Sequence, residues 1–324
     1  LCVYAADRFG DMFSSKSEET YGVKIDDDMM RNFCYLFLFM VLFAGCGSAR
    51  SVALEDLLRN YINSKDAKIG VAVVIDGKLL TGMNEKDSFP MLSVFKFPLA
   101  LTVAEKARKI GCTFDDSLSV KASQLHADTW SPMLEKYPAN SNHVITINEL
   151  LDYSLRSSDN NACDILLDFV GGTSVVDSCL KAMGINDISV RWNEHDMNTV
   201  IARCYDNSST PAAMAMLMYE FDGNFNDANS LRIKRMMESC ETGTDRLPKP
   251  FVATNAVVGH KTGTGPMDNG RIMAVNDAGY VHLPNGKRYA IAVFVAGSAY
   301  SMDETAKIIA EISEMVLRNV NGGI

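Results

Sequence analysis

Two places in the chain carry a serine followed three residues later by a lysine, and such a pair can carry out acyl transfer. Ser93 precedes Lys96, and Ser178 precedes Lys181. A serine hydroxyl becomes an effective nucleophile when a neighbouring base takes its proton, and residues at i and i+3 of a helix share one face. Burial near other cations lowers the pKa of a lysine toward the neutral form that accepts such a proton. The alternative for either pair is an ordinary helix face with one serine and one solvated lysine.

The order of three motifs along the chain distinguishes the two pairs. The sequence reads S-D-N at residues 158–160, after a helical pattern, and K-T-G-T at residues 261–264, after a strand pattern. Only Ser93 precedes both motifs, whereas Ser178 follows the first of them. The combination of S-x-x-K, S-D-N and K-T-G is typical of class A β-lactamases and penicillin-binding proteins. The chain therefore resembles these enzymes, with Ser93 as the nucleophile.

The resemblance extends over nearly the whole chain after the leader segment and is most specific for class A serine β-lactamases. Residues 89–96 resemble the nucleophile segment, residues 130–132 the loop at the site entrance, and residues 194–198 the Ω-loop. The Tyr-Asp-Asn sequence at residues 205–207 is similar to the branch of cephalosporinases found in Bacteroides and its relatives. The resemblance implies hydrolysis of the β-lactam amide of cephalosporins and penicillins through an acyl-enzyme, and hence antibiotic resistance.

Five catalytic residues follow from the resemblance: Ser93, Lys96, Ser158, Glu194 and Lys261. Ser93 would form the acyl-enzyme, and Lys96 or Glu194 would take its proton, a choice that is disputed for the family. Ser158 would pass a proton to the departing lactam nitrogen, and Lys261 would tune Ser158 and attract the substrate carboxylate. Glu194 would act as the base for the water that releases the product.

Seven substrate-binding residues follow in the same way. Asn198 shares one helical face with Glu194 and would help to hold the hydrolytic water. The backbone amides of Ser93 and Thr264 would form the oxyanion hole. The full set is Trp130, Asn160, Asn198, Thr262, Gly263, Thr264 and Arg246.

Three departures from the family pattern bear on this site. Many members close the Ω-loop with an Arg–Asp salt bridge, but Trp192 and Asn207 occupy the matching positions here. We expect the loop to be held through Asp206 or Arg191 instead. Where many members have a carboxylate-binding arginine after K-T-G, this chain has Asn269, and Arg246 would substitute for it unless it is a surface arginine. The cysteine of the carbapenemase subgroup is absent, since Leu92 precedes Ser93.

The hydrophobic periodicity predicts the elements that position these residues. Helical spacing covers residues 52–62, 93–110, 150–155, 161–170, 174–183, 212–219, 231–238 and 302–320, and strand patterns cover residues 69–75, 78–81, 253–260, 271–283 and 288–296. A polar connection without a clear period covers residues 186–210. Thr146 and Ser301, each followed three residues later by a glutamate, predict helix starts.

Strands at both ends of the chain and helices in its middle predict an α+β fold. We expect a five-stranded antiparallel sheet flanked by N- and C-terminal helices, with an all-helical second domain, as in the β-lactamase and transpeptidase folds. The sheet part would comprise residues 50–92 and 250–324, and the helical part residues 93–249.

The first 46 residues carry a targeting pattern. Met29 to Asn32 hold one positive charge, and an apolar run follows from Phe33 to Phe43 before the small residues that precede Cys46. This pattern predicts a secretory signal over residues 29–45 and lipidation of Cys46, as in bacterial lipoproteins, with residues 1–28 as upstream translation. The alternative is an uncleaved anchor or a buried helix. We expect an exported, periplasmic domain over residues 46–324, which is anchored to the membrane if Cys46 carries a lipid.

Composition excludes several other classes of protein. The net charge of −9 lacks the basic patch of a nucleic-acid binder. The five histidines lack metal-ligand spacing, and the eight cysteines form no C-x-x-C pair, so we expect no metal and no cofactor. We expect a monomer that acts on a small β-lactam. The alternatives are a penicillin-binding peptidase that acylates without turnover and a non-catalytic lipoprotein that senses β-lactams or peptidoglycan.

Overall fold

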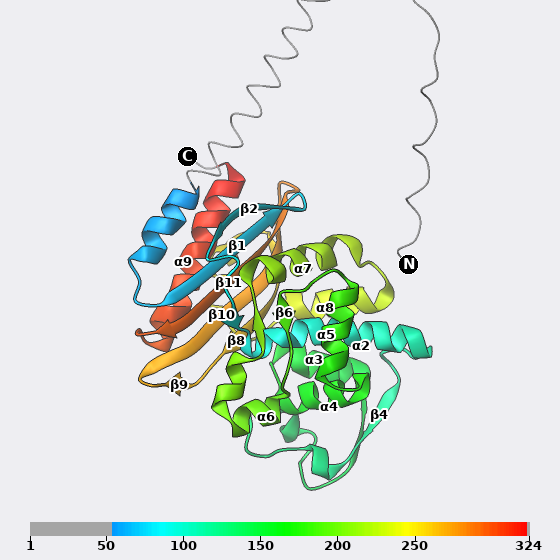
Figure 1. Cartoon of the computed structure of the whole chain (residues 1–324). Helices are drawn as coiled ribbons and strands as arrows, with labels where there is room; N and C mark the ends of the chain where they lie inside the picture. The colour runs from blue at the N-terminus through cyan, green and yellow to red at the C-terminus, as the bar shows by residue number, and fades with distance from the viewer. Residues whose placement is uncertain (1–53, 323–324) are drawn as a thin grey trace, which may run out of the picture. The chain divides into compact units, whose positions relative to one another are not determined.

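A six-stranded sheet forms one half of the fold in the computed structural model, which describes residues 54–322 (Figure 1). Its antiparallel path runs β2-β1-β11-β10-β8, and the short β9 pairs with β10 outside this path. The strands are β1 (Lys68–Ile75), β2 (Lys78–Met83), β8 (Val257–Thr264), β9 (Met267–Asp268), β10 (Arg271–His282) and β11 (Arg288–Ser298). The predicted antiparallel sheet is confirmed, with the two-residue β9 as an addition.

Both faces of the sheet are buried, because helices cover each of them. Successive residues of a strand point to opposite faces, and β1 divides accordingly. Val71 and Val73 join the core that contains the helical residues 54–63 and α9 (Met302–Asn321), whereas Ala72 and Val74 join the core that contains α7 (Pro211–Asn224). The apolar run of β1 is therefore continuous rather than alternating, as in sheets that are covered on both sides.

The helical half is organised around α2 (Lys96–Ile110). Its first eight residues are all buried, because α3 (Ile147–Arg156), α4 (Asn160–Val170), α5 (Thr173–Ala182) and α8 (Ala228–Glu238) pack around it. A helix that is apolar on all sides is typical of such a central position. The buried Lys96 opens this helix and is the exception that the chemistry of the site must explain.

The predicted polar connection over residues 186–210 is an ordered segment. It contains β6 (Ile188–Ser189), α6 (Glu194–Thr199), the 3-10 helix η4 (Ile201–Tyr205) and β7 (Ser208–Ser209). β7 pairs with both β6 and β3 (Phe89–Pro90), and β3 lies just before the nucleophile segment. This three-stranded sheet fixes both ends of the connection. A second small sheet joins β4 (Ser117–Val120) to β5 (His143–Thr146).

Two predicted boundaries are wrong at the site. The last strand before the K-T-G motif was predicted over residues 253–260, but β8 starts at Val257 and includes the whole motif. Polar residues in a strand look like a loop in the sequence, yet Lys261 and Thr262 are buried because β8 pairs with β10. Ser93 lies in a 3-10 turn, η1 (Leu92–Phe95), and α2 begins only at Lys96.

The two predicted helix caps agree with the structure. The hydroxyls of Thr146 and Ser301 cap α3 and α9 by accepting from the backbone N–H of Glu149 and Glu304. The five cysteines of the described part are free thiols. Within residues 54–322 no helix has the length and apolar character needed to cross a membrane, and no group of three metal-ligating side chains forms.

The predicted domain boundaries are only partly covered by these residues. The described residues 54–322 belong to one compact unit. Its division into a sheet part and a helical part remains a prediction. One helix of the predicted helical range, α7, packs on the sheet. The predicted signal segment and Cys46 lie outside the described residues.

Candidate active site

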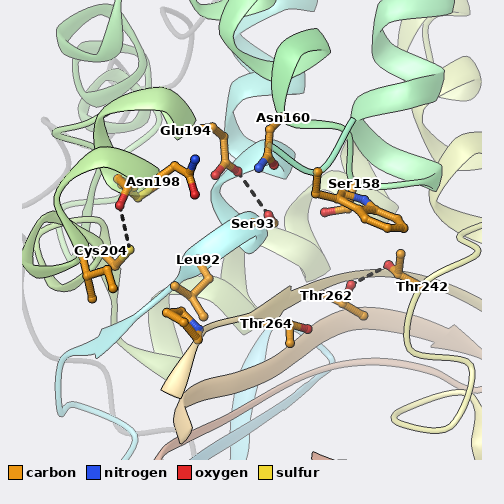
Figure 2. A pocket seen from close by; sticks show the side chains of 14 residues that line it. Leu92, Ser93, Ser158, Asn160, Glu194, Asn198, Cys204, Thr242, Thr262 and Thr264 are labelled. Carbon is orange, nitrogen blue, oxygen red and sulfur yellow. Dashed lines mark hydrogen bonds between the residues drawn. The ribbon is translucent and has the colours of Figure 1, made fainter. Parts of the chain in front are cut away.

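A pocket of about 390 Å³ lies between the edge strand β8, the 3-10 turn η1 and the helical half (Figure 2). Eight of the twelve predicted site residues line it: Ser93, Trp130, Ser158, Asn160, Glu194, Asn198, Thr262 and Thr264. The remaining four, Lys96, Lys261, Gly263 and Arg246, are buried around this pocket. The structure therefore brings together residues from six separate stretches of the sequence.

The hydroxyl of Ser93 is bonded to the carboxylate of Glu194, as Figure 2 shows. Ser93 Oγ donates to Glu194 Oε1 at 3.1 Å. The same carboxylate oxygen lies 2.9 Å from Lys96 Nζ, and the Lys96 side chain is fully buried. One carboxylate oxygen thus joins the nucleophile to a buried cation.

Lys96 is held by three oxygen atoms. Besides Glu194 Oε1, its Nζ donates to the backbone oxygen of Ser158 and to Asn160 Oδ1, each at 2.7 Å. A lysine ammonium group has three protons to donate and no acceptor. The three contacts match the charged form of Lys96, and they leave the Glu194 carboxylate as the acceptor that faces Ser93.

Lys261 lies next to the second serine of the pocket. Its Nζ donates to Ser158 Oγ at 2.9 Å and to the backbone oxygen of Thr262 at 3.0 Å. Burial, helped by the nearby Lys96 cation, lowers the pKa of Lys261 to about 8 against the attraction of neighbouring anions. Near neutral pH Lys261 is therefore a cation that can release a proton readily toward Ser158.

The backbone is strained at two residues of the pocket. Leu92, which precedes the nucleophile, has a φ of 48°, and Ser158 has a φ of 61°. The left-handed region costs a residue with a side chain about 1–2 kcal/mol, and such strain concentrates at functional sites. Gly263 shows how tightly the segments meet, because a Cβ there would lie 2.4 Å from the backbone oxygen of Met91.

Glu194 is positioned by a residue that the sequence analysis missed. Asp164 on α4 accepts from the backbone N–H of Glu194 at 2.8 Å and of His195 at 2.9 Å. Burial and the Glu194 charge raise the pKa of Asp164 to about 7. Asp164 follows Asn160 by four residues, so both lie on the helix face toward the pocket. That spacing is the signal that could have revealed it.

The Ω-loop is closed by the side-chain amide of Asn207. Asn207 Oδ1 accepts from the backbone N–H of Arg191 at 2.7 Å and of Trp192 at 2.9 Å, and its Nδ2 donates to the backbone oxygen of Trp192 at 2.8 Å. The predicted absence of the Arg–Asp salt bridge at these positions agrees with this arrangement. A neutral buried amide does the work of that ion pair.

Of the two residues expected to hold the loop, Asp206 takes part and the Arg191 side chain does not. Asp206 Oδ2 accepts from Trp192 Nε1 at 2.8 Å. The Arg191 guanidinium turns outward to Asp177 at 3.5 Å, with its side chain 61% exposed. Arg203 adds to the closure by lying 4.1 Å above the Trp192 ring and bonding Asp196 at 2.7 Å.

Replacing Asn207 with alanine is expected to loosen the Ω-loop. Two N–H groups and one carbonyl oxygen would lose their partners, and each such group left unpaired in the interior costs about 1–3 kcal/mol. We expect the free energy of unfolding in urea to fall by roughly 3 kcal/mol. Asn255→Ala, at an exposed asparagine, is the control and should leave the urea midpoint unchanged. Equal midpoints for both variants would show that Asn207 does not hold the loop.

Arg246 is buried rather than on the surface, so the interpretation as a surface arginine is wrong. Its Nη2 donates to Thr264 Oγ1 at 2.7 Å, and its Nη1 donates to the backbone oxygens of Gly263 and Asn276 at 3.2 and 3.1 Å. Asn269, by contrast, is exposed in the turn between β9 and β10. The positive charge beside the K-T-G-T segment therefore comes from Arg246.

The remaining predicted residues lie at the mouth of the pocket. Trp130 is 62% exposed, and its Nε1 donates to the backbone oxygen of Ser157 at 2.9 Å. Asn198 follows Glu194 by one turn of α6 and also lines the pocket. An indole ring held at the rim leaves one apolar face for a ligand.

Comparisons with known proteins agree on one group. A family model described as a beta-lactamase enzyme family matches residues 53–320. A beta-lactamase of Bacteroides uniformis is 38% identical over 268 residues, which cover 81% of this chain and 90% of the relative. Beta-lactamase VEB-1 of Pseudomonas aeruginosa is 37% identical over 270 residues, which cover 80% of this chain and 87% of the relative.

Two solved structures show the same architecture. A class A beta-lactamase from Bacteroides cellulosilyticus superposes with a TM-score of 0.80 and 36% identity, covering 84% of this chain and 99% of that one. The TLA-1 extended-spectrum beta-lactamase also gives a TM-score of 0.80, at 38% identity, and covers 83% of this chain and 99% of that one.

Proposed function

The chain belongs to the beta-lactamase enzyme family, and from this we propose that it is a class A serine β-lactamase acting through an acyl-enzyme on Ser93. Its substrates are cephalosporins and penicillins, and its activity gives antibiotic resistance. The observation that carries this proposal is the contact of Ser93 Oγ with the Glu194 carboxylate. A carboxylate beside the nucleophile supplies the base that distinguishes hydrolysis from lasting acylation.

Acylation begins with loss of the Ser93 proton. Glu194 is the group in place to accept it, since Lys96 already donates to three oxygens. Ser93 Oγ then attacks the β-lactam carbonyl, and the backbone amides of Ser93 and Thr264 receive the negative charge that develops on the carbonyl oxygen. Removing one such donor costs about 10²–10³ in rate in comparable sites.

Opening of the lactam ring needs a proton on its nitrogen. Ser158 Oγ supplies that proton, and Lys261, bonded to Ser158 Oγ at 2.9 Å, restores it. The proton taken up by Glu194 returns to Lys261 through solvent, so Glu194 is again a base. A water held by Glu194 and Asn198 then attacks the ester on Ser93, and release of the acid regenerates the enzyme.

The substrate carboxylate is bound by the K-T-G-T segment. The hydroxyls of Thr262 and Thr264 reach the pocket, and Lys261 and Arg246 place positive charge behind them. Hydrogen bonds to a charged partner are the stronger ones. This arrangement suits a ligand whose carboxylate sits beside the lactam ring, as in cephalosporins and penicillins.

The proposal is tested with the chromogenic cephalosporin nitrocefin and by intact-protein mass spectrometry over time. We expect hydrolysis of nitrocefin and a transient adduct of one β-lactam per chain. An adduct that persists would instead indicate a penicillin-binding peptidase or a covalent sensor. A chain that neither hydrolyses nitrocefin nor gains mass would have neither activity.

The kcat/KM for nitrocefin is expected to fall as the pH rises through about 8. Lys261 is charged below its pKa of about 8 and neutral above it, so the cation that attracts the substrate carboxylate is lost on the alkaline side. Lys261→Arg keeps the charge at high pH and should move this alkaline decline upward by at least about one pH unit. Lys181→Arg, at an exposed residue of α5, is the control. An unmoved decline in Lys261→Arg would assign it to another group.

We also propose that the enzyme is exported, acts as a monomer, and is anchored through a lipid on Cys46. The apolar run before the small residues at 44–45 supports this placement. In fractionated cells we expect the chain in the membrane fraction facing the periplasm, and Cys46→Ser in the soluble periplasmic fraction. Activity confined to the cytoplasm in both cases would contradict export.

A further inference from the structure

Three buried side chains behind β8 form a Cys–His–Asp series that the proposed mechanism does not use. Asp277 on β10 lies 2.9 and 3.0 Å, through its two oxygens, from His260 Nδ1. The charge of His260 also acts on Cys240, which follows α8. All three residues are at least 92% buried. A cation near a cysteine favours the thiolate over the thiol.

The series continues to the wall of the pocket. Cys240 Sγ lies 3.4 Å from Thr242 Oγ1, and Thr242 Oγ1 lies 2.5 Å from Thr262 Oγ1. Thr242 and Thr262 both line the pocket, and Figure 2 draws the contact between their hydroxyls. The backbone allows this approach at Gly243, where a Cβ would lie 2.5 Å from Thr262 Cγ2. An unbroken path of polar groups therefore joins Cys240 to Thr262.

We propose that Cys240, supported by His260 and Asp277, is a positioning residue that sets whether the Thr262 hydroxyl donates into the pocket or away from it. The proposal rests on the proposed function, because the group that Thr262 meets is the carboxylate of a β-lactam. It adds a control of substrate affinity by a buried thiol that never touches the substrate.

The direction of the hydroxyls follows from the protonation state of Cys240. A neutral thiol is a weak acceptor, so the Thr242 hydroxyl donates to Thr262 Oγ1, and the Thr262 proton is free for the substrate carboxylate. A thiolate is a strong acceptor, so Thr242 donates to Cys240 and in turn accepts from Thr262. The Thr262 proton then points away from the pocket, and its oxygen lone pairs face the carboxylate.

The surroundings of Cys240 allow both states. Its Sγ lies 3.7 Å from the backbone oxygens of Leu155 and Arg156 on α3, which can accept a thiol proton. The carbonyls favour the neutral thiol, whereas nearby cations favour the thiolate. These cations are His260 and Lys261 on β8, and Arg246. Asp277 is the anion that faces His260, and Glu241 beside Cys240 is paired with Arg156.

Charge balance identifies Cys240 as the group that titrates near neutral pH. Burial disfavours its thiolate, but His260, Lys261 and Thr242 outweigh burial and lower the pKa of Cys240 to about 7. Burial likewise disfavours the His260 cation, but Asp277 and Cys240 raise the pKa of His260 to about 10. His260 therefore stays charged while Cys240 changes state. The thiol form, and with it tight carboxylate binding, prevails below about pH 7 and is lost above it.

The experiment measures KM and kcat for nitrocefin between about pH 5.5 and about pH 7.5, below the decline expected from Lys261. An affinity that depends on one of two states falls in proportion to the fraction of the competent state. The neutral thiol fraction of Cys240 is near one at about pH 5.5 and about a quarter at about pH 7.5. The KM of the unaltered chain should therefore rise about fourfold between these two pH values. The proposal assigns this rise to KM rather than to kcat.

Cys240→Ser is the decisive variant, because a serine hydroxyl keeps the hydrogen-bond path but does not ionise in this range. Its KM should stay at the low-pH value throughout, and Cys240→Ala should also lose the rise. Cys179→Ala, at a partly buried thiol on α5 away from the pocket, should behave like the unaltered chain. A difference titration of thiolate ultraviolet absorbance between the unaltered chain and Cys240→Ser should show one group ionising near pH 7.

The outcomes separate this inference from the proposed function. A rise in KM that survives in Cys240→Ser, or the absence of any rise in the unaltered chain, overturns the role of Cys240 while leaving hydrolysis intact. Absence of the thiolate titration near pH 7 overturns it without reference to activity. Failure of the unaltered chain to react with nitrocefin at any pH would instead overturn the proposed function.

Discussion

Ser93→Ala is expected to lower kcat/KM for nitrocefin by about 10⁴-fold or more and to abolish the covalent adduct with any β-lactam. The reason is that Ser93 Oγ is the only hydroxyl in the described pocket bonded to the Glu194 carboxylate. Without it the pocket can bind the substrate but can form no ester. Steady-state hydrolysis and intact mass after mixing with substrate are the two measurements.

Ser178→Ala is the matched control for this change. Ser178 and Lys181 repeat the S-x-x-K spacing on α5, but Ser178 is exposed, and its hydroxyl donates to the backbone oxygen of Ser174 at 2.8 Å. Its loss should leave both hydrolysis and adduct formation unchanged. Hydrolysis that survives in Ser93→Ala would exclude the acyl-enzyme on this serine.

Glu194→Gln is expected to separate acylation from release of the product. The glutamine cannot take a proton from water, so hydrolysis of the ester on Ser93 should slow by about 10²–10⁴-fold. Lys96 would lose its carboxylate partner at 2.9 Å. Lys96 would then be the remaining candidate base for Ser93. We expect a burst of one equivalent of ring-opened substrate that stays bonded to Ser93 as a stable adduct.

The mass of this adduct and its lifetime give the measurement. Glu220→Gln on α7, outside the residues that line the pocket, is the control and should turn over normally. Unchanged turnover in Glu194→Gln would remove the Ω-loop base from the mechanism. A variant that forms no adduct would show that Glu194, and not Lys96, must take the Ser93 proton.

Motif order and spacing were sufficient to predict residues that the structure brings together around one pocket. Ser93, Ser158 and Lys261 each belong to a short motif, but their exact settings were not predicted: Ser93 lies in the turn η1, Ser158 between α3 and α4, and Lys261 inside β8. The antiparallel sheet was also predictable, because its strands have continuous apolar runs and the last two are joined by a clear turn at Asn285-Gly286.

The supporting contacts could not be predicted, because they join residues that are far apart in the sequence. Asn207 bonds backbone groups about fifteen residues away, and Asp164 bonds groups thirty residues away. Neither contact has a local pattern, since an asparagine in a polar stretch and an aspartate in a helix are common. The partners of Cys240 are likewise set by how α8 packs against β8, which periodicity does not reveal.

The end of strand β8, which contains the K-T-G motif, could not be predicted either. Apolar periodicity stops at His260, so a strand was expected to stop there too. The strand continues because β10 supplies backbone partners up to Thr264. Burial of Lys261 and Thr262 is tolerated because each finds hydrogen bonds, with Ser158 and Thr242 respectively. Functional polar residues inside a strand are therefore the places where sequence patterns mislead.

The pairing of β1 with β11 has a consequence for biosynthesis. Lys68 in β1 pairs with Ala296 in β11, so the sheet cannot close until β11 has left the ribosome. Contacts of such long sequence separation form slowly. A nascent chain that already contains Ser93 and Glu194 is therefore still an open, protease-sensitive polypeptide. Catalytic competence arises only with the last strand and helix, as a late and all-or-none event.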